Sequence, residues 1–171
     1  VQGRKSQQWK QEVEFSVKPF KEFAVSYSDK GVLRKGAKVT AVTSKSHSGK
    51  YICRKLRMAD MPCQNMDQIN RHIRVLSSVD HPHLCKLIDA FEDKSNLYLV
   101  YERANPMTLF EHIREKSSLT EEEAADYMRQ VAMALSVAHS QGIAHGKLSP
   151  RSIILAEEDE DEDNDARIKI C

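Results

Sequence analysis

Several features that would narrow the class of this protein are absent from its sequence. The 171 residues carry a formal net charge of +1, which gives no overall attraction to nucleic acid or to an anionic membrane. No apolar run approaches the roughly 20 residues that span a bilayer, and no signal peptide is recognisable. We therefore expect a cytoplasmic protein with no transmembrane segment and no nucleic-acid partner. The chain begins with Val1 rather than Met, which is typical of a fragment.

Cysteine is scarce, and its spacing is uninformative. The 4 cysteines of the chain are Cys53, Cys63, Cys85 and Cys171. No two of them form a C-x-x-C pair, and their spacing matches no disulfide framework. We expect four reduced thiols, as is usual in a cytosolic protein.

A metal site is not indicated either. Within the acidic run EEDEDEDND, Asp159, Asp161 and Asp163 have the spacing of the first ligands of an EF-hand calcium loop. Asn164 then stands where that loop requires Gly, and Ile170 stands where it requires Glu. A solvated loop between two strands is the better interpretation of the run.

The sequence does contain enough apolar residues for a packed core, since it is 40% hydrophobic and 30% charged. Residues 1–26 are polar and basic with scattered aromatic side chains, and they predict an N-terminal extension of unknown role. From Val32 to Leu56, the apolar runs KVTAV and YICRKL flank the turn-forming stretch TSKSHSG. This pattern predicts a β-hairpin.

Helix and strand signals follow one another along the rest of the chain. In DQINRHIRVLSSV, the residues Ile69, Ile73 and Leu76 recur at helical spacing and predict an amphipathic helix. The nearly all-apolar run NLYLVYE predicts a buried strand. RSIIL and RIKI predict two more strands, so the expected fold class is α+β.

The strongest local signal marks a long helix. Thr120 and Glu123 form a capping box at its start, and Gly142 suits its C-terminal cap. The apolar stripe expected between them consists of Met128, Val131, Leu135 and Ala138.

The stretch GIAHGKLSPRSIIL follows that helix and carries a recognisable motif. Protein kinases have H-R-D-L-x-x-x-N at this point, and the corresponding residues here read HGKLSPRS. LSSVDHPHLCKLIDAFEDKSNLYLVYE is similar to the kinase run from the third helix to the hinge, and RIKIC to the strand before D-F-G. From about residue 27 to residue 171, the chain resembles a protein kinase domain of the calcium/calmodulin-dependent group, closest to the calcium-dependent protein kinases.

The resemblance implies a protein kinase-like fold of two lobes. Residues 1–26 would precede the domain as an extension. Residues 27–103 would form the small β-rich lobe and the hinge, and residues 104–171 the first part of the helical large lobe. The chain would then end before D-F-G.

The catalytic loop is degenerate relative to the family that it resembles. Lys147 stands at the position of the catalytic base Asp, Ser149 at that of a lysine near the transferred phosphate, and Ser152 at that of the magnesium-binding Asn. A lysine accepts a proton near neutral pH only if its pKa falls by roughly 3 units, which costs about 4 kcal/mol. His145 is retained, in a family position whose role is packing. We therefore expect no intact catalytic residue and no metal ligand.

The positions that would bind ATP are altered as well. Lys55 matches the lysine that pairs with the phosphates, but its glutamate partner on the following helix is replaced by His72. Of the glycine-rich loop only Gly36 remains, because Arg34 and Val39 occupy the other glycine positions.

At the hinge, Tyr101 occupies the gatekeeper position, and Thr108 replaces the acidic residue that often holds the ribose. If ATP binds, the resemblance implies that its contacts are Lys55, Gly36, Glu102 and Ala104.

These substitutions leave three hypotheses. The first is a pseudokinase that acts by binding or allosteric regulation. The second is an active or weakly active ATP-dependent serine/threonine kinase, and the third is an interaction module with no nucleotide site. ATP with magnesium is the cofactor that the resemblance implies, but the substitutions argue against it. The partner would be a protein of unknown identity.

The helix that carries His72 has lost its ion pair with Lys55. We expect this helix to be free to move and to expose apolar surface. That surface would contact either a partner protein or the N-terminal residues Trp9 and Phe15.

Overall fold

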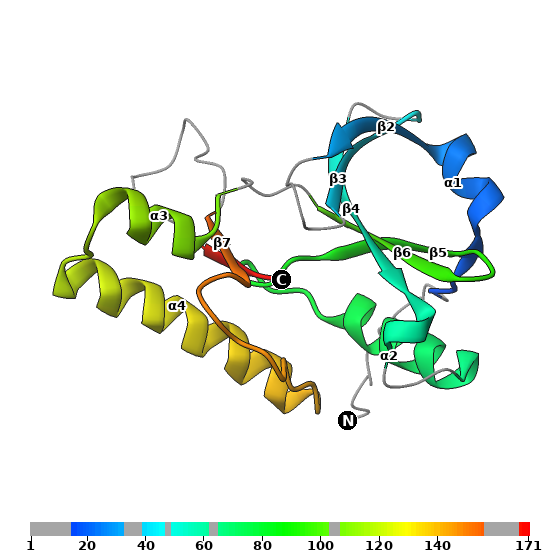
Figure 1. The fold of residues 1–171 in the computed structure, drawn as a ribbon. Coiled ribbons are helices and arrows are strands. Elements are labelled where there is room, and N and C mark those ends of the chain that lie inside the picture. The colour runs from blue at the N-terminus through cyan, green and yellow to red at the C-terminus, as the bar shows by residue number, and fades with distance from the viewer. Residues whose placement is uncertain (1–14, 33–38, 47–48, 62–64, 103–106, 156–167) are drawn as a thin grey trace, which may run out of the picture.

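The structure is a computed structural model of the chain, and its elements are shown in Figure 1. It describes residues 15–32, 39–46, 49–61, 65–102, 107–155 and 168–171. A sheet with two flanking helices forms one lobe, and two further helices with a small β-hairpin form the other. The expected α+β class is confirmed.

Six strands form the main sheet. Their bounds are β1 Lys18–Pro19, β2 Tyr27–Val32, β3 Val39–Ser44, β4 Lys50–Arg57, β5 Leu87–Glu92 and β6 Asn96–Glu102. The spatial order is β1-β5-β6-β4-β3-β2, with β1 parallel to β5 and every other pair antiparallel. The predicted hairpin is confirmed as β3 and β4, and the predicted strand NLYLVYE is β6, which is paired on both sides.

Helices cover both faces of this sheet (Figure 1). The flanking helices are α1 Phe20–Ser26 and α2 Met66–Ser78, and a short 3-10 turn, η1 Met58–Asp60, follows β4. On one face, Phe20 and Phe23 of α1 pack against a buried cluster of Tyr27, Val42, Cys53, Phe91 and Val100. On the other face, Ile69 and Ile73 of α2 pack against Leu87, Ala90, Leu97 and Leu99, and we call these six residues the α2 cluster.

The predicted amphipathic helix is confirmed as α2, with one departure at its end. Ile69 and Ile73 are buried, whereas Leu76 is 40% exposed and faces a cleft between the lobes. Asn65 caps the helix by accepting a hydrogen bond from the backbone N–H of Asp67 at 2.9 Å. The helix is therefore seated on the sheet through its first two turns.

The residues before β2 are attached to the sheet. The Lys18 ammonium donates to Asp89 at 2.6 Å, and the Tyr27 hydroxyl donates to the same carboxylate at 2.7 Å. Phe15 packs against the buried cluster that α2 forms with the sheet. The expectation that α2 is free to move and uncovers apolar surface stays a prediction. Trp9, the other N-terminal residue expected at α2, lies outside the described residues.

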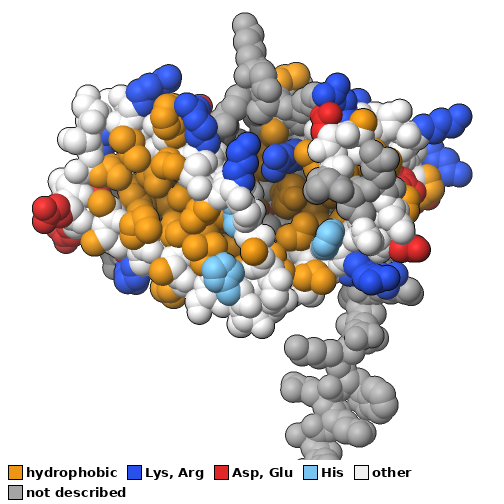
Figure 2. Space-filling model, turned by 60° about the horizontal axis from the view of Figure 1, so that its bottom comes forward, with side chains coloured by type: hydrophobic (Ala, Val, Ile, Leu, Met, Phe, Trp, Pro, Cys, Tyr) orange, Lys and Arg blue, Asp and Glu red, His pale blue; other side chains and the backbone are white. Residues whose placement is uncertain are grey.

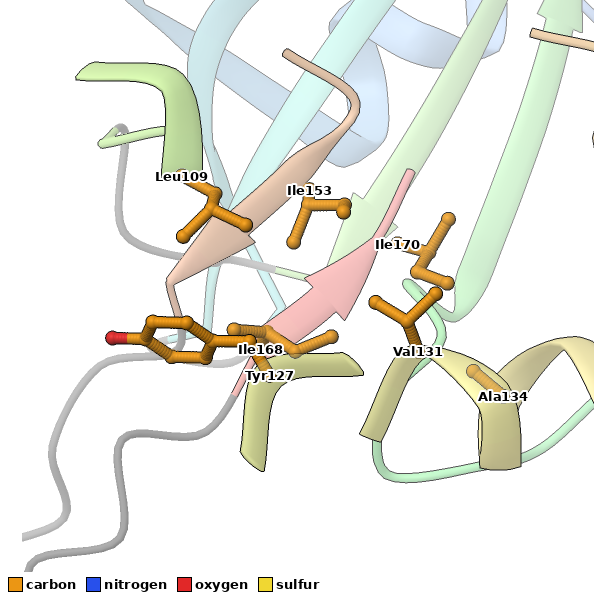
Figure 3. Close-up of a cluster of buried hydrophobic side chains, with 7 residues drawn as sticks. All are labelled: Leu109, Tyr127, Val131, Ala134, Ile153, Ile168 and Ile170. Carbon is orange, nitrogen blue, oxygen red and sulfur yellow. The ribbon is translucent and has the colours of Figure 1, made fainter. Parts of the chain in front are cut away.

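The second lobe is built on two helices. Its elements are α3 Leu109–Lys116, α4 Glu121–Ser140, β7 Ile153–Leu155 and β8 Ile168–Ile170. Figure 3 shows its core, in which side chains of α3 and α4 meet those of the β7–β8 hairpin. The buried members are Leu109, Tyr127, Val131, Ala134, Ile153, Ile168 and Ile170. The two strands predicted near the end of the chain are thus confirmed as one antiparallel pair.

The predicted long helix is confirmed at both ends. Thr120 and Glu123 make both hydrogen bonds of the capping box, at 2.9 and 3.1 Å. Gly142 follows the C-cap with φ of +75°, and the N–H of Ile143 donates to the carbonyl of Ala138.

The predicted stripe of α4 is wrong at one position. Met128 is 61% exposed, and Tyr127 is buried in its place. The remaining buried positions of the helix agree with a stripe that starts from Tyr127, since Val131, Ala134 and Ala138 lie four, seven and eleven residues further on.

The expectation of four reduced thiols is wrong. Cys85 and Cys171 form a disulfide with their Cα atoms 5.3 Å apart and 86 residues apart in sequence. Pairing of the backbone brings them together, because the N–H of Cys85 donates to the carbonyl of Ile170 at 2.9 Å. Cys53 is free but buried, and this burial raises the pKa of its thiol to about 12. Cys63 lies outside the described residues.

The described residues include neither a membrane-spanning helix nor a metal-binding cluster. Within the described ranges, no helix combines the length and apolar character needed to cross a bilayer. The same ranges contain no cluster of three or more His, Cys, Asp or Glu side chains that could hold a metal ion. The acidic run EEDEDEDND lies outside them.

Candidate functional site: the cleft between the lobes

A cleft of about 1050 Å³ separates the two lobes. Val39 and Ile52 line it from the sheet, Leu76 from α2, and Ile154 and Ile170 from the β7–β8 hairpin. Figure 2 shows it as a hollow in the middle of one face, with Lys and Arg side chains along its margin. A largely apolar lining of this kind is typical of small-molecule sites.

The charges that line the cleft are mostly positive. Among the described residues its lining includes the cations Arg54, Lys55, Arg57, Lys147 and Arg151 and the single carboxylate of Asp60. That carboxylate is already engaged, because the Arg57 guanidinium donates to it at 2.8 and 3.0 Å. The cleft therefore favours an anionic ligand.

Lys55 lies on the far face of the sheet from the α2 cluster. Its ammonium is 5.2 Å from the centroid of the Tyr98 ring. Tyr98 in turn stacks on Phe20 of α1 with ring centroids 4.2 Å apart. The cation is thus held over an aromatic ring beside α1.

Arg54 takes the opposite face of β4. Side chains alternate along a strand, and residues directly opposite each other in an antiparallel pair share a face. Arg54 lies opposite Leu99 of β6, a member of the α2 cluster. Ile52, two residues earlier on the same face of β4, lies opposite Tyr101, which packs against that cluster. Burial raises the pKa of Tyr101, and the positive charge of Arg54 opposes that rise. Sequence reasoning missed Arg54, although strand alternation could have indicated it.

In the kinase family, a glutamate on the following helix forms an ion pair with the phosphate-binding lysine. Neither Arg54 nor Lys55 has such a partner among the described residues. His72 is exposed on α2, and the structure records no contact between His72 and Lys55, both of which it describes. Arg54 likewise makes no ion pair with any carboxylate in the described ranges. Its positive charge is available to a ligand in the cleft.

The loop that carries Lys147 is fixed by its own hydrogen bonds. The backbone N–H of Lys147 donates to His145 Nδ1 at 3.2 Å, and His145 Nε2 lies 3.3 Å from the carbonyl oxygen of Cys171. Ser152 Oγ accepts from the N–H of Ser149 at 3.0 Å and donates to its carbonyl at 2.9 Å. His145 and Ser152 therefore both hold the loop in shape.

The described part of the cleft does not fit magnesium. Mg²⁺ is bound through carboxylate oxygens and keeps octahedral geometry. Asp60 is bound to Arg57, and the Ser152 hydroxyl is used within its own turn. The ammonium of Lys147 also lines the cleft, and its positive charge repels a divalent cation.

The hinge residue Glu102 joins the lobes through its side chain. Its carboxylate accepts from the Lys169 ammonium at 2.7 Å and from the N–H of Lys86 at 3.0 Å. Its contact with a nucleotide would therefore have to come from its backbone. Gly36 and Ala104, the other two contacts expected from the sequence, lie outside the described residues.

Thr108 serves as a helix cap in this structure. It is 2% exposed, and its hydroxyl accepts from the N–H of Glu111 at 3.3 Å and donates to the Glu111 carboxylate at 2.8 Å. Both halves of a capping box are thus present at the start of α3. This use explains why a threonine stands at the position.

Arg151 is a cleft residue that sequence reasoning missed. Its guanidinium lies 3.6 Å from the centroid of the Phe110 ring in α3. No local sequence signal links these two residues, because the contact depends on the packing of the loop against α3.

Comparison with known proteins gives a consistent result. The family model described as "Protein kinase domain" matches residues 32–171. Calcium/calmodulin-dependent protein kinase type 1 of Macrobrachium nipponense is 38% identical over 95 residues, which are 56% of this chain and 28% of that protein. Calcium-dependent protein kinase 5 of Plasmodium falciparum is 36% identical over 97 residues, 57% of this chain and 17% of that protein.

A human protein and a solved structure extend the comparison. NUAK family SNF1-like kinase 1 of Homo sapiens is 32% identical over 108 residues, 63% of this chain and 15% of that protein. The chain thus spans less than a third of the length of these relatives. The crystal structure of Rad53 residues 1–466 in complex with AMP-PNP superposes with a TM-score of 0.72 at 22% identity, covering 86% of this chain and 38% of that one. With its sheet lobe, its helical lobe and a family match over most of its length, the chain belongs to the protein kinase domain family.

Proposed function

We propose that this chain is part of a pseudokinase, a kinase-fold domain that acts by binding or allosteric regulation and not by phosphoryl transfer. The observation that carries the proposal is the charge of the cleft. Its described lining holds five cationic residues and one carboxylate, and that carboxylate is bound to Arg57. Phosphoryl transfer needs carboxylates for magnesium and for the attacking hydroxyl, and this lining has none to offer.

Lys147 supports the proposal on chemical grounds. It stands where the family has its base, and a lysine ammonium has no lone pair with which to accept a proton. A phosphate-bearing ligand nearby would favour the charged ammonium and hold it in that form. Lys147 suits the binding of an anion.

An active or weakly active ATP-dependent serine/threonine kinase is the second candidate. It is favoured by the curated relatives, which are named as calcium/calmodulin-dependent and calcium-dependent protein kinases. A third candidate is an interaction module with no nucleotide site. The apolar walls and the free charge of Arg54 weigh against it, because they suit an aromatic base and a phosphate.

ATP, if it binds, is proposed to bind without magnesium and with Arg54 as its phosphate contact in place of Lys55. The division into an extension at 1–26, a small lobe at 27–103 and the start of a large lobe at 104–171 also belongs to this proposal, as does a cytoplasmic location. The Cys85–Cys171 disulfide weighs against that location, because reducing compartments keep most thiols reduced.

The test is a phosphoryl-transfer assay on the full-length protein with radiolabelled ATP, magnesium and a basic serine peptide. An active calcium/calmodulin-dependent kinase serves as the positive control. We expect no transfer and no ADP release above the buffer blank. Magnesium-dependent ADP release that disappears in Arg54→Met or Lys55→Met would show that the domain is an enzyme.

A further inference from the structure

The Cys85–Cys171 disulfide forms part of the wall of the cleft. Both cysteines are among the residues that line it, and they enter it from different lobes, since Cys85 precedes β5 and Cys171 follows β8. A disulfide in the wall of a cavity is a reactive group as well as a crosslink, because a thiolate that enters the cavity can attack it. The cleft volume of about 1050 Å³ is of the size that takes a small molecule, whereas a folded protein is too large to enter.

The charges that line the same cleft select which thiol can approach the disulfide. Among the described residues, the lining holds four cations besides Arg57, and Arg57 itself is bound to the lining's one carboxylate, that of Asp60. A cavity lined by positive charge raises the local concentration of an anionic solute. The same potential stabilises a thiolate, both the one that attacks and the one that leaves. The cleft therefore favours reduction by a thiol that carries negative charge.

Lys147 is tied to Cys171 through a single imidazole. The backbone N–H of Lys147 donates to His145 Nδ1 at 3.2 Å, and His145 Nε2 lies 3.3 Å from the carbonyl oxygen of Cys171. Lys147 and His145 both line the cleft, and Lys147 makes no ion pair with a carboxylate that the structure describes. Its ammonium is thus available to a carboxylate of a molecule that reaches the disulfide.

Cys53 provides an internal comparison for these two cysteines. It is 3% exposed in the cluster beneath α1, and it is not among the residues that line the cleft. Burial raises the pKa of its thiol to about 12. Because the thiolate is the form that exchanges, Cys53 should not react with a small disulfide or thiol.

We propose that the cleft is a thiol–disulfide exchange site for a small anionic thiol of the glutathione class, whose carboxylates contact Lys147 and whose sulfur reduces the Cys85–Cys171 bond. In the first step the incoming thiolate attacks one cysteine sulfur, the S–S bond breaks, and the other cysteine leaves as a thiolate. A second thiolate then attacks the mixed disulfide and releases the oxidised small molecule and the second cysteine thiolate. Two small thiols thereby become one disulfide, and the two protons that they lose go to the two cysteines. The inference is independent of the proposed function, because exchange requires neither ATP nor phosphoryl transfer.

The test measures the rate at which three thiols of different charge reduce the disulfide in the full-length protein. Glutathione is anionic, 2-mercaptoethanol is neutral and cysteamine is cationic. Each rate constant is expressed per thiolate and divided by that of the same thiol toward 2-hydroxyethyl disulfide, an uncharged reference. Mass spectrometry of the linked Cys85 and Cys171 peptides follows the reaction, and all samples carry Cys63→Ser to keep the peptide map simple.

We expect the normalised rates to fall in the order glutathione, 2-mercaptoethanol, cysteamine. At low ionic strength glutathione should lead 2-mercaptoethanol by about threefold or more, a factor of the size of one exposed charge contact. The lead should shrink as salt is raised, because salt screens the attraction. Equal normalised rates for the three thiols at low salt would overturn the proposal.

Lys147→Gln tests the cation that is assigned to the carboxylate of the thiol. It should slow glutathione about twofold or more and leave the rate of 2-mercaptoethanol unchanged, since only the anionic thiol uses the charge. Lys94→Gln is the matched control, because Lys94 is also exposed but lies in the turn between β5 and β6 and does not line the cleft. An equal loss of the glutathione preference in both variants would overturn the assignment in favour of a general effect of net charge.

Trapping the mixed disulfide locates the reaction. In Cys85→Ser and in Cys171→Ser the remaining cysteine of the pair cannot close the bond, so oxidised glutathione should attach one glutathionyl group to it and release one glutathione. Cys53 should stay unmodified in the same samples. Modification of Cys53 to the same extent as the cleft cysteine would show that exchange does not depend on the cleft, and the proposal would then be wrong. Phosphoryl transfer by the same protein would overturn only the proposed function and leave this inference standing.

Discussion

Arg54 and Lys55 are adjacent cations with different surroundings. Both line the cleft, but Arg54 faces the α2 side of the sheet and Lys55 lies over the Tyr98 ring on the α1 side. A change of one residue in strand position reverses the face of a side chain. The choice of Arg54 as the proposed phosphate contact depends on that single step.

Removing each cation in turn should separate their roles. If ATP binds with a Kd of about 0.1 mM, a concentration of about 1 mM stabilises the fold by roughly 1.4 kcal/mol, or about 4 °C in Tm. We expect Arg54→Met to abolish this shift and Lys55→Met to retain most of it, in buffer with a chelator and no magnesium. The measurement is a thermal melt with and without ATP. A shift lost only in Lys55→Met would show that the lysine reaches the ligand.

At this scale, sequence reasoning succeeded where a residue acts locally and failed where it acts through packing. His145 was interpreted as a packing residue, and its imidazole does contact Lys147 and Cys171. Lys55 was named because it matches the phosphate-pairing lysine of the kinase family, and the neighbouring Arg54, on the other face of β4, was not considered. The stacking of Arg151 on Phe110 joins residues 41 positions apart, and no periodicity reveals it.

Among the elements, α4 is the one whose start is most fully specified by sequence. Thr120 and Glu123 satisfy each other's backbone N–H groups, and Lys116 of α3 pairs with the Glu123 carboxylate. The Lys116 hydrogen bond is the largest of the causes that lower the pKa of Glu123 to about 2. The cap therefore also fastens α4 to α3.

Thr120→Ala should lower the free energy of unfolding by about 1 kcal/mol, the usual cost of losing an N-cap hydroxyl. Urea melts of the wild type and of this variant at neutral pH measure the difference.

The pH dependence of the stability at this cap follows from the depressed pKa of Glu123. Its contribution to stability is present above the unfolded value of about 4.3 and is lost as the pH falls through the folded value of about 2. Urea melts of wild type and of Glu123→Gln between these limits measure the difference. A gap between the two that stays constant across this window would contradict the assignment.

A helix or strand was predictable where the residues that determine it are close together in the sequence. The capping box fixed the start of α4, and the Ser- and Gly-rich turn fixed the β3–β4 hairpin. The exposure of Met128 was not predictable, because two neighbouring helical faces carry apolar residues and only packing against the hairpin selects Tyr127. The attachment of β1 as a parallel edge strand beside β5 joins segments about 70 residues apart and has no local signal.

For the whole molecule, the Cys85–Cys171 disulfide is a covalent connection between segments 86 residues apart. It links the segment before β5 in the sheet lobe to the residue after β8 in the helical lobe. Around it the lobes also meet through the Lys169–Glu102 ion pair and the backbone bond from Ile170 N–H to His83. The two lobes are therefore joined beside the cleft by covalent and noncovalent contacts together.

Reducing this disulfide should destabilise the domain. A loop of 86 residues gives about 4.6 kcal/mol in the chain-entropy account, which corresponds to a fall of roughly 10 to 15 °C in Tm for a domain of this size. We expect the wild type to show that fall when a reductant is added. Cys85→Ser/Cys171→Ser should melt at the lower temperature with or without reductant, while Cys53→Ser should still respond to it. A wild type that melts identically in both conditions would mean that the bond does not form in solution.

The disulfide closes the chain between residues 85 and 171 into a covalent ring. This ring contains the hinge residue Glu102, the helices α3 and α4, and the loop at residues 141–152. The strands β1 to β4 and the helices α1 and α2 precede Cys85 and lie outside the ring. One peptide bond broken anywhere in the ring opens it without producing two molecules, because the sulfur atoms still join the two pieces. Limited proteolysis of the oxidised protein can therefore relax the geometry of the cleft while the lobes stay together, and separation of the lobes requires a second, reductive event.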